Sequence, residues 1–398
     1  MGKKEKAPCL RFKDTNGKDY PAWEQRKLGE LAATFGYGLN AAAKSFDGRH
    51  KYIRITDIDE STRRFLCSSL TSPDIDFEEA APYRLAEGDV LFARTGASVG
   101  KSYRYVRTDG EVYFAGFLIR FRFKDKEAAE FVFQNSLTAK FQNFIKTSSQ
   151  RSGQPGINAQ QFSGYQIAVP NSEERERIGS FFSRLDTAIT LHQRKLETLK
   201  KLKRTLLQKM FPKKGQLKPE LRFPGFTNDW EQRKLEELAS KFTGGGTPNT
   251  SNPNYWNGEI PWIQSSDLKE DDVLSLTVKK HISQEGLKNS ATKIVPKNSL
   301  VIVTRVGVGK LVVNTQEIAT SQDFLSLSGI KGDSRFLAYS LYSLLKKITR
   351  RVQGTSIKGI TKTDFLKETI LVPALEEQEK ISSCMVEVDK LITLHQRE

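Results

Sequence analysis

The stretch with the clearest potential for chemistry is "RTGASVGKS", residues 94–102, because Gly96 is followed by the Gly100-Lys101-Ser102 triplet of a phosphate-binding loop. A Walker-type loop needs four residues between its first glycine and the Gly-Lys pair, and it must open a helix. Here only Ala97, Ser98 and Val99 intervene. The sequence that follows, "YRYVRTDGEVYF", alternates aromatic and polar residues around a Thr-Asp-Gly turn, which predicts a hairpin of strands. The spacing therefore argues against ATP binding by this loop.

Other catalytic motifs are also incomplete. "NPNYW", Asn252 to Trp256, lacks the second proline of the Asn-Pro-Pro-aromatic motif of amino-methyltransferases, and no Gly-rich cofactor loop precedes it. The stretch favours a loop with an aromatic tip. Cys9, Cys67 and Cys384 lie far apart and none has a second ligand at metal-binding spacing, so we expect reduced thiols. The sequence predicts no catalytic residue, no metal site and no cofactor bound by this chain.

The composition indicates a polyanionic partner. The chain has 398 residues and a formal net charge of +16, and such a surplus of Lys and Arg is most often matched by nucleic acid. No run of about 18 apolar residues is present, and the N-terminus lacks the apolar core of a signal peptide. We expect a cytoplasmic protein that contacts no membrane.

The sequence contains an internal duplication. "WEQRKLGELA" from Trp23 recurs as "WEQRKLEELA" from Trp230, and each is preceded by Leu-Arg-Phe. "QIAVP" ending at Pro170 matches "ILVP" ending at Pro373, and "LHQR" occurs at residues 191–194 and 394–397. The middles differ strongly, so the pattern predicts one scaffold that presents two different surfaces.

The repeat also bears on the glycine loop. In the second copy it reads "RVGVGK", from Arg305 to Lys310, which is two residues shorter and has lost the serine. Pairing Arg94 with Arg305 and Lys101 with Lys310 leaves a hairpin tip with two cations, suited to a phosphate backbone or to base edges. An ordinary tight turn with exposed cations is the alternative.

A long helix follows the first "QIAVP" strand. Asn171 or Ser172 can cap it, and no proline occurs before Pro212. Its apolar residues alternate steps of four and three, the period of a coiled coil, with Lys203 as a break that Leu202 can fill. The seam is Ile178, Phe182, Leu185, Ile189, His192, Leu196, Leu199, Lys203, Leu206 and Met210.

The second copy repeats this seam in shorter form, at Ile381, Met385, Val388, Ile392 and His395. The two seam histidines suit a polar register position better than a metal site. About 40 helical residues span roughly 60 Å, so paired helices would form a rod with a globular region at each end. Such a protein would act as a ruler that reads a split DNA site with an unread spacer.

Each globular half is predicted to be mixed α+β. Residues 126–147 place Phe133, Leu137, Phe141, Phe144 and Ile145 on one helical face, and "SRFLAYSLYSLLKKITRRVQ" matches them in the second half. These strongly apolar faces indicate scaffold helices, while the remaining residues form short strands with Gly, Asp and Asn turns.

Taken together, the paired "WEQRKL" blocks, the "QIAVP/ILVP" strands before Glu-rich helix starts, and the repeated "LHQR" resemble the specificity subunit of type I restriction–modification enzymes. The resemblance implies two target-recognition domains, at 1–170 and 214–373, and conserved spacer helices, at 171–213 and 374–398, that pack antiparallel. It also implies that each domain reads one half of a bipartite site in double-stranded DNA. Two modification subunits that bind S-adenosylmethionine, and restriction subunits that use ATP and Mg²⁺, are the implied partners.

The sequence departs from the family at its end. The first helix continues past "LHQR" for about 17 residues, whereas the printed chain stops after the second "LHQR". In antiparallel pairing the second helix would face the C-terminal half of the first, and the seam from Ile178 to Ile189 would lack part of its partner.

Sixteen residues are candidates for DNA contact. They lie in the hairpins, in the matched loops "GQPGINAQ" and "SIKGITKT", and in the loops that differ between halves; Arg and amide side chains suit base edges and Lys suits phosphate. The candidates are Tyr37, Asn40, Arg54, Arg94, Thr95, Lys101, Arg151, Gln154, Asn158, Asn254, Trp256, Gln264, Arg305, Lys310, Lys358 and Thr361. The sequence thus favours a non-catalytic DNA-binding subunit. A self-contained DNA-modifying enzyme and a coiled-coil adaptor for proteins remain as alternatives.

Overall fold

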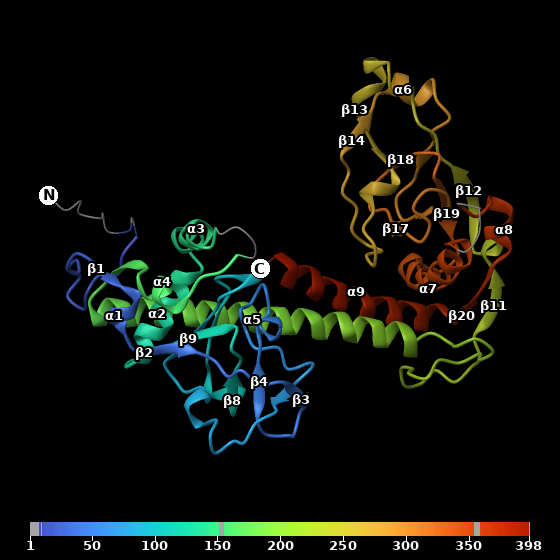
Figure 1. Cartoon of the computed structure of the whole chain (residues 1–398). Coiled ribbons are helices and arrows are strands. Elements are labelled where there is room, and N and C mark those ends of the chain that lie inside the picture. The colour runs from blue at the N-terminus through green and yellow to red at the C-terminus, as the bar shows by residue number, and fades with distance from the viewer. Residues whose placement is uncertain (1–7, 9, 151–154, 354–358, 398) are drawn as a thin grey trace. The chain divides into compact units, whose positions relative to one another are not determined.

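The computed structural model describes residues 8, 10–150, 155–353 and 359–397 (Figure 1). The residue contacts divide the chain into a first unit, Met1–Thr190, and a second unit, Leu191–Glu398. Helix α5, Ser172–Lys209, is unbroken and contributes its first half to the first unit and its second half to the second unit. The four-part division of the chain inferred from the sequence stays a prediction.

The first unit mixes short strands with helices. Its helices are α1 (Leu28–Leu31), α2 (Lys126–Ser136), α3 (Ala139–Ser148) and α4 (Ala159–Ser163). Its strands are β1 (Glu24–Lys27), β2 (Ala32–Tyr37), β3 (Ala43–Ser45), β4 (Lys51–Ile53), β5 (Thr71–Pro73), β6 (Asp89–Ala93), β7 (Ser102–Arg104), β8 (Val112–Phe114), β9 (Leu118–Phe123) and β10 (Gln166–Val169).

The second unit has the same kind of composition. Its helices, besides the second half of α5, are α6 (Gln284–Lys288), α7 (Ser334–Gln353), α8 (Lys362–Lys367) and α9 (Leu375–Arg397). Its strands are β11 (Glu231–Lys234), β12 (Ala239–Gly244), β13 (Trp256–Ile263), β14 (Lys280–Ile282), β15 (Ile294–Val295), β16 (Leu300–Val303), β17 (Leu311–Val313), β18 (Ile318–Thr320), β19 (Phe324–Ile330) and β20 (Thr369–Val372).

Each unit has its own central four-stranded sheet, and the two sheets have the same topology. The strand order is β2-β9-β6-β7 in the first unit and β12-β19-β16-β17 in the second, with every neighbour antiparallel. One face of each sheet is covered by helices, through Phe131 and Phe141 in the first unit and through Phe336 and Leu345 in the second. The duplication read from the sequence is therefore also a duplication of topology.

The repeated sequence blocks connect each unit to the start of the helix that follows its last strand. The two "EQRK" segments are β1 and β11, and they pair antiparallel with β10 and β20, the strands that end before each helix. Arg11 of the first Leu-Arg-Phe makes a bidentate pair with Glu174 at 2.6 and 2.9 Å, and Arg222 of the second pairs with Glu377 at 2.7 and 2.8 Å. The shared blocks are thus scaffold.

Helices α5 and α9 pair antiparallel within the second unit, as expected. The rings of His192 and His395 lie 5.6 Å apart, and farther along α5 the Lys203 ammonium lies 2.6 Å from Asp389. Asn171 caps α5 by accepting a hydrogen bond from the backbone N–H of Glu174 at 2.9 Å. On the N-terminal half of α5, the seam residues Phe182, Leu185 and Ile189 are exposed.

Lys203 occupies the helix seam itself, contrary to the prediction from the sequence. Leu202 was expected to replace it in the seam, but Leu202 is 43% exposed and Lys203 is 9% exposed. The lysine is accommodated because Asp389 neutralises its charge and the carbonyl oxygen of Asp271 accepts a hydrogen bond from Nζ at 2.7 Å. A charged residue can occupy a helix seam when partners of this kind satisfy it.

Two local expectations about the first unit were wrong. The single helix predicted over 126–147 is two helices, because the chain turns at Leu137 and Thr138, and Thr138 starts α3 as its N-cap. The hairpin predicted after residue 102 does not form, because β7 pairs with β6 while β8 pairs in parallel with β4 in another sheet. Tertiary pairing outweighed the local turn signal.

Candidate nucleic-acid interface

Three loops meet at one end of the central sheet of the first unit. They are the hairpin loop after β6, the turn between β8 and β9, and the loop before α4. The backbone N–H of Arg94 donates to the carbonyl of Phe117 at 3.1 Å, and the N–H of Ile157 donates to the carbonyl of Arg94 at 2.9 Å. The backbone of Gly38 packs closely against these loops, and only glycine fits there, since a Cβ would lie 2.3 Å from the Ala115 carbonyl oxygen.

The second unit repeats this backbone arrangement with different side chains. The N–H of Thr304 donates to the carbonyl of Asp323 at 2.8 Å, and the N–H of Ile360 donates to the carbonyl of Thr304 at 2.9 Å. Gly245 takes the place of Gly38, because a Cβ there would lie 2.1 Å from the Ser321 carbonyl oxygen. The two units therefore present matched loop clusters at matched ends of their sheets.

This match corrects the pairing of the two arginines. By backbone hydrogen bonds Arg94 corresponds to Thr304, so Arg305 lies one residue farther along its loop than Arg94 does. Aligning the two loops by sequence paired Arg94 with Arg305, because both loops contain Arg, Gly and Lys in the same order. Both loops do connect antiparallel strands, and a strand, β7 or β17, follows each instead of the helix that a nucleotide loop requires.

Arg94 lies in an aromatic setting. Its guanidinium carbon lies 4.9 Å from the centre of the Tyr37 ring and 5.8 Å from that of Phe117. Its Nε is buried and, among the described residues, has no hydrogen-bond partner. Tyr37 is fixed in turn, because its hydroxyl accepts a hydrogen bond from the backbone N–H of Ala159 at 3.2 Å. The next residue, Thr95, forms an isolated bridge with Gly156.

Two predicted cations are engaged within the protein. Lys101, expected at an exposed tip, is only 9% exposed, and its Nζ lies 2.9 Å from Glu60; the tight backbone of the loop turns it inward. Contact of Lys101 with a phosphate would require that pair to open. Arg54 donates through Nε and Nη2 to Asp57 at 2.8 and 2.9 Å, whereas the counterpart Gln264 donates to Ser266 at 2.9 Å.

Several residues predicted to contact DNA make hydrogen bonds or packing contacts within the protein. Asn158 and Thr361 are the N-caps of α4 and α8, and accept from the backbone N–H groups of Gln161 and Asp364 at 2.8 and 3.1 Å. Trp256 is half-buried: its ring meets Trp262 edge to face, and its indole N–H donates to the carbonyl of Asn249. Trp256 begins β13 directly after the loop, and its contact with DNA stays a prediction.

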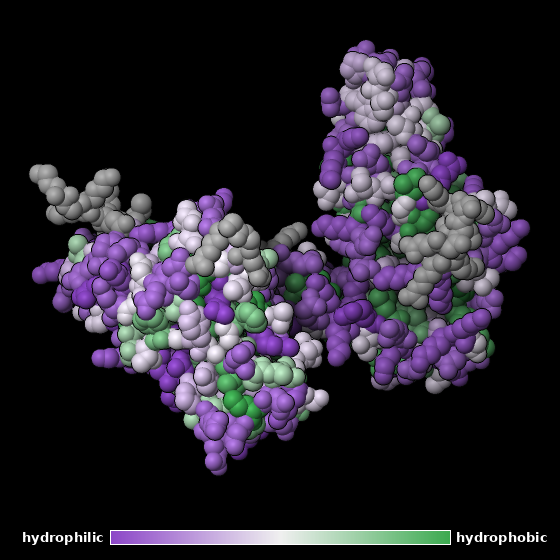
Figure 2. Space-filling model, in the orientation of Figure 1, coloured by the Kyte–Doolittle hydropathy of each residue, from purple (hydrophilic) through white to green (hydrophobic). Residues whose placement is uncertain are grey.

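The other candidates lie at the surface or outside the described residues. Asn40, Asn254 and Arg305 are exposed, and Lys310 is half-buried. Arg151, Gln154 and Lys358 lie outside the described residues. Figure 2 shows hydrophilic residues over most of the visible surface of each unit. All sixteen DNA contacts stay predictions, and the structure divides them into surface groups and groups already used inside the protein.

Phe117 was not among the residues predicted from the sequence to contact DNA. This side chain is 59% exposed at the turn before β9 and stands beside Arg94. The corresponding residue in the second unit is Asp323, judged by the backbone hydrogen bonds. The signal was an aromatic residue in a glycine turn, "AGF", whose counterpart is "SQD", but only the backbone match makes the two positions equivalent.

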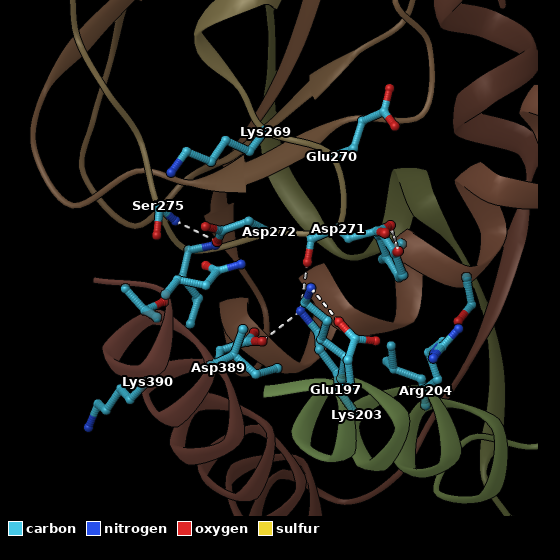
Figure 3. Close-up of a pocket in the computed structure, with 18 of the residues that line it drawn as sticks. Glu197, Lys203, Arg204, Lys269, Glu270, Asp271, Asp272, Ser275, Asp389 and Lys390 are labelled. Carbon is cyan, nitrogen blue, oxygen red and sulfur yellow. Dashed lines mark hydrogen bonds and ion pairs between the residues drawn. The ribbon is translucent and has the colours of Figure 1, made fainter. Parts of the chain in front are cut away.

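A cavity of about 850 Å³ lies in the second unit between α5, α7, α9 and the loop after Leu268. Figure 3 shows Lys203 reaching from α5 to Asp389 and to the main chain of Asp271. Six basic and five acidic side chains line the cavity, so their charges nearly cancel and the cavity offers little attraction to a polyanion. Burial raises the pKa of Asp389, while Lys203 opposes that rise. The cavity is best described as a polar joint between the helices and the loop.

Among the described residues, no group of three His, Cys, Asp or Glu side chains could hold a metal ion. Within the same ranges, no helix is both long and apolar enough to cross a lipid bilayer.

The chain matches the family model of the type I restriction modification DNA specificity domain twice, over residues 21–201 and 227–398. It therefore belongs to that family, and it carries two copies of the domain.

Two relatives and one solved structure show the extent of the likeness. The MjaX type I restriction enzyme specificity subunit of Methanocaldococcus jannaschii is 26% identical over 97% of this chain and 92% of its own length. The EcoR124I/EcoR124II specificity subunit of Escherichia coli is 28% identical over 40% of this chain and 41% of its own length. A crystal structure of a type I restriction–modification S subunit from M. genitalium covers 94% of this chain and 91% of its own, with a TM-score of 0.61 and 13% identity, which supports the fold.

Proposed function

We propose that this chain is the DNA-reading specificity subunit of a type I restriction–modification complex, and that each unit reads one half of a bipartite target. The observation that carries the proposal is the matched pair of loop clusters. Their backbone hydrogen bonds are the same, while their side chains differ at equivalent places, Arg94 against Thr304 and Phe117 against Asp323. Two domains built alike with unlike loops suit two different half-sites.

The proposal assigns no chemistry to the chain itself. Methyl transfer would come from two modification subunits that bind S-adenosylmethionine, and cleavage from restriction subunits that use ATP and Mg²⁺. This chain would bring them to the target in the cytoplasm. The net charge of +16 favours binding to DNA, because Lys and Arg neutralise phosphates and release their counterions.

The test is binding and methylation by the reconstituted chain with its modification subunits. Fluorescence anisotropy with a randomised duplex pool, followed by sequencing of the bound fraction, is expected to yield two short motifs separated by a fixed spacer. Affinity is expected to fall steeply as salt is raised. Catalysis by the lone chain would instead support a self-contained enzyme, and absence of DNA binding with modification subunits present would support a protein adaptor.

Arg305→Ala is a residue-level arm of the same test. If this exposed arginine contacts a base, its loss is expected to weaken cognate binding by about 1–3 kcal/mol and to relax one position of the second motif. An unchanged binding curve for Arg305→Ala at moderate salt would remove it from the interface.

A further inference from the structure

Phe117 is an exposed aromatic residue of the loop cluster that was not among the residues predicted to contact DNA. It is 59% exposed in a domain whose other phenylalanines mostly fill the core, so its ring is available to contact a ligand. It lies at the meeting point of the three loops of the first unit, beside the guanidinium of Arg94.

The position of Phe117 is fixed by the backbone on both sides. Its carbonyl accepts from Arg94, and the next residue, Leu118, is fully buried and donates its N–H to the carbonyl of Ala115 at 2.9 Å. Gly116 donates to the carbonyl of Leu39 at 2.8 Å. A side chain held in this way can meet a ligand without the entropic cost of ordering a loop.

The surroundings of Phe117 suit the edge of a base. Tyr37 and Phe117 both lie within 6 Å of the Arg94 guanidinium, so two apolar faces flank a group of planar N–H donors. Guanidinium donors suit guanine, and an apolar ring suits the methyl group of thymine in the major groove. At the equivalent places the second unit has Gly244, the buried Thr304 and Asp323, so it lacks both rings and the cation.

We propose that Phe117 is a specificity-determining residue of the first unit, which contacts the methyl group of a thymine in the first half-site. Arg94 and Tyr37 hold the ring in place and set the neighbouring base preference. This inference rests on the proposed function, because it assumes that the first unit reads DNA.

The experiment uses the full chain with its modification subunits. The bipartite motif is first determined for the wild type, and each thymine of the first half-site is then replaced in turn by deoxyuridine, which lacks only the methyl group. At one position the replacement is expected to weaken wild-type binding by about threefold to fivefold. The same replacement is expected to have no effect on Phe117→Ala.

A swap to the residue of the second unit gives an independent measurement. Phe117→Asp is expected to reduce cognate affinity by about tenfold to hundredfold and to change the motif at one or two positions of the first half-site only. Leu10→Asp introduces the same charge at a side chain that is 91% exposed, and it is expected to change neither affinity nor motif. Thermal unfolding of Phe117→Ala confirms that the folded state is retained.

The outcomes separate this inference from the proposed function. If the wild type selects no motif, the proposed function fails. If the wild type selects a bipartite motif but no thymine methyl group is coupled to Phe117, and Phe117→Asp keeps the motif, the assignment of Phe117 is overturned while the proposed function stands.

Discussion

At the scale of single residues, buried ion pairs tie the repeated blocks together. Glu174 and Glu377 have 0% and 1% side-chain exposure, and each receives two hydrogen bonds from the arginine of its Leu-Arg-Phe segment. A buried carboxylate without its partner is costly, because its charge is desolvated with no compensating interaction.

We therefore expect Arg222→Ala to lower the free energy of unfolding of the second unit by about 3–5 kcal/mol. Hydrogen exchange followed by mass spectrometry reads each unit separately, so the loss should appear in the second unit while the first is unchanged. Arg233→Ala breaks an exposed pair with Glu231, and is expected to cost less than about 1 kcal/mol. Equal effects of the two substitutions would contradict the argument.

Asp59 gives the first unit a pH-dependent contribution. Hydrogen bonds from the backbone N–H of Thr62 and from the hydroxyls of Ser61 and Thr62 lower the pKa of Asp59 from 3.8 to about 2. A folded-state pKa below the unfolded value adds stability that is present above about pH 4 and is lost as the pH falls toward 2.

Acid titration of the first unit, followed by hydrogen exchange, is expected to show this loss between pH 4 and 2. Asp59→Ala should be less stable than the wild type at pH 7 and should lose less stability over the acid range. Parallel acid profiles for the two proteins would show that Asp59 makes no such contribution.

At the scale of secondary-structure elements, the polar joint around Lys203 connects α5, α9 and the loop at Asp271. Tyr339 of α7 adds a hydrogen bond from its hydroxyl to Asp389 at 2.7 Å, and burial raises the pKa of that tyrosine strongly. Since burial also raises the pKa of Asp389, its ionised form is costly unless the lysine remains.

Lys203→Ala is accordingly expected to destabilise the second unit by about 3–5 kcal/mol. The double variant Lys203→Met with Asp389→Leu, which removes both charges, should recover most of that loss, because an apolar pair tolerates burial better than a lone carboxylate. Urea unfolding monitored by hydrogen exchange in the second unit measures both. A double variant less stable than Lys203→Ala would contradict this account.

At the scale of the whole molecule, α5 is a single helix that belongs to both units. It runs without a break from Ser172 to Lys209, and it packs at Gly179 against Glu130 of the first unit and at Lys203 against Asp389 of the second. Under the proposed function, the length of this helix sets the number of unread base pairs.

A four-residue insertion after Thr190, duplicating residues 187–190, lengthens α5 by about 6 Å, which is about two base pairs of DNA rise. The selected motif is expected to keep both half-sites and to gain one or two base pairs of spacer. The same four residues inserted after Gly215, in an exposed loop with nothing near its Cβ position, should leave the spacer unchanged. A constant spacer in both variants would exclude α5 as the ruler.

The sequence by itself determined the duplication, the scaffold blocks and the long helix, because each is recorded in local patterns. The duplication can be recognised from the identical "WEQRKL" blocks and the paired Leu-Arg-Phe segments, and the long helix from its seam of alternating steps. None of these patterns requires knowledge of contacts between distant residues. It also excluded the phosphate loop, since loop length and the strand that follows are local properties.

Tertiary structure decided which side chains of the loops face the solvent. Only the fold shows that Lys101 turns inward to Glu60, that Asn158 and Thr361 cap helices, and that Lys203 finds a partner 186 positions away. It also placed the true equivalence, Arg94 with Thr304 and Phe117 with Asp323, through backbone hydrogen bonds between segments distant in the chain. Residue type and spacing fix what a group can do, whereas burial and long-range partners fix whether that group is available to a ligand.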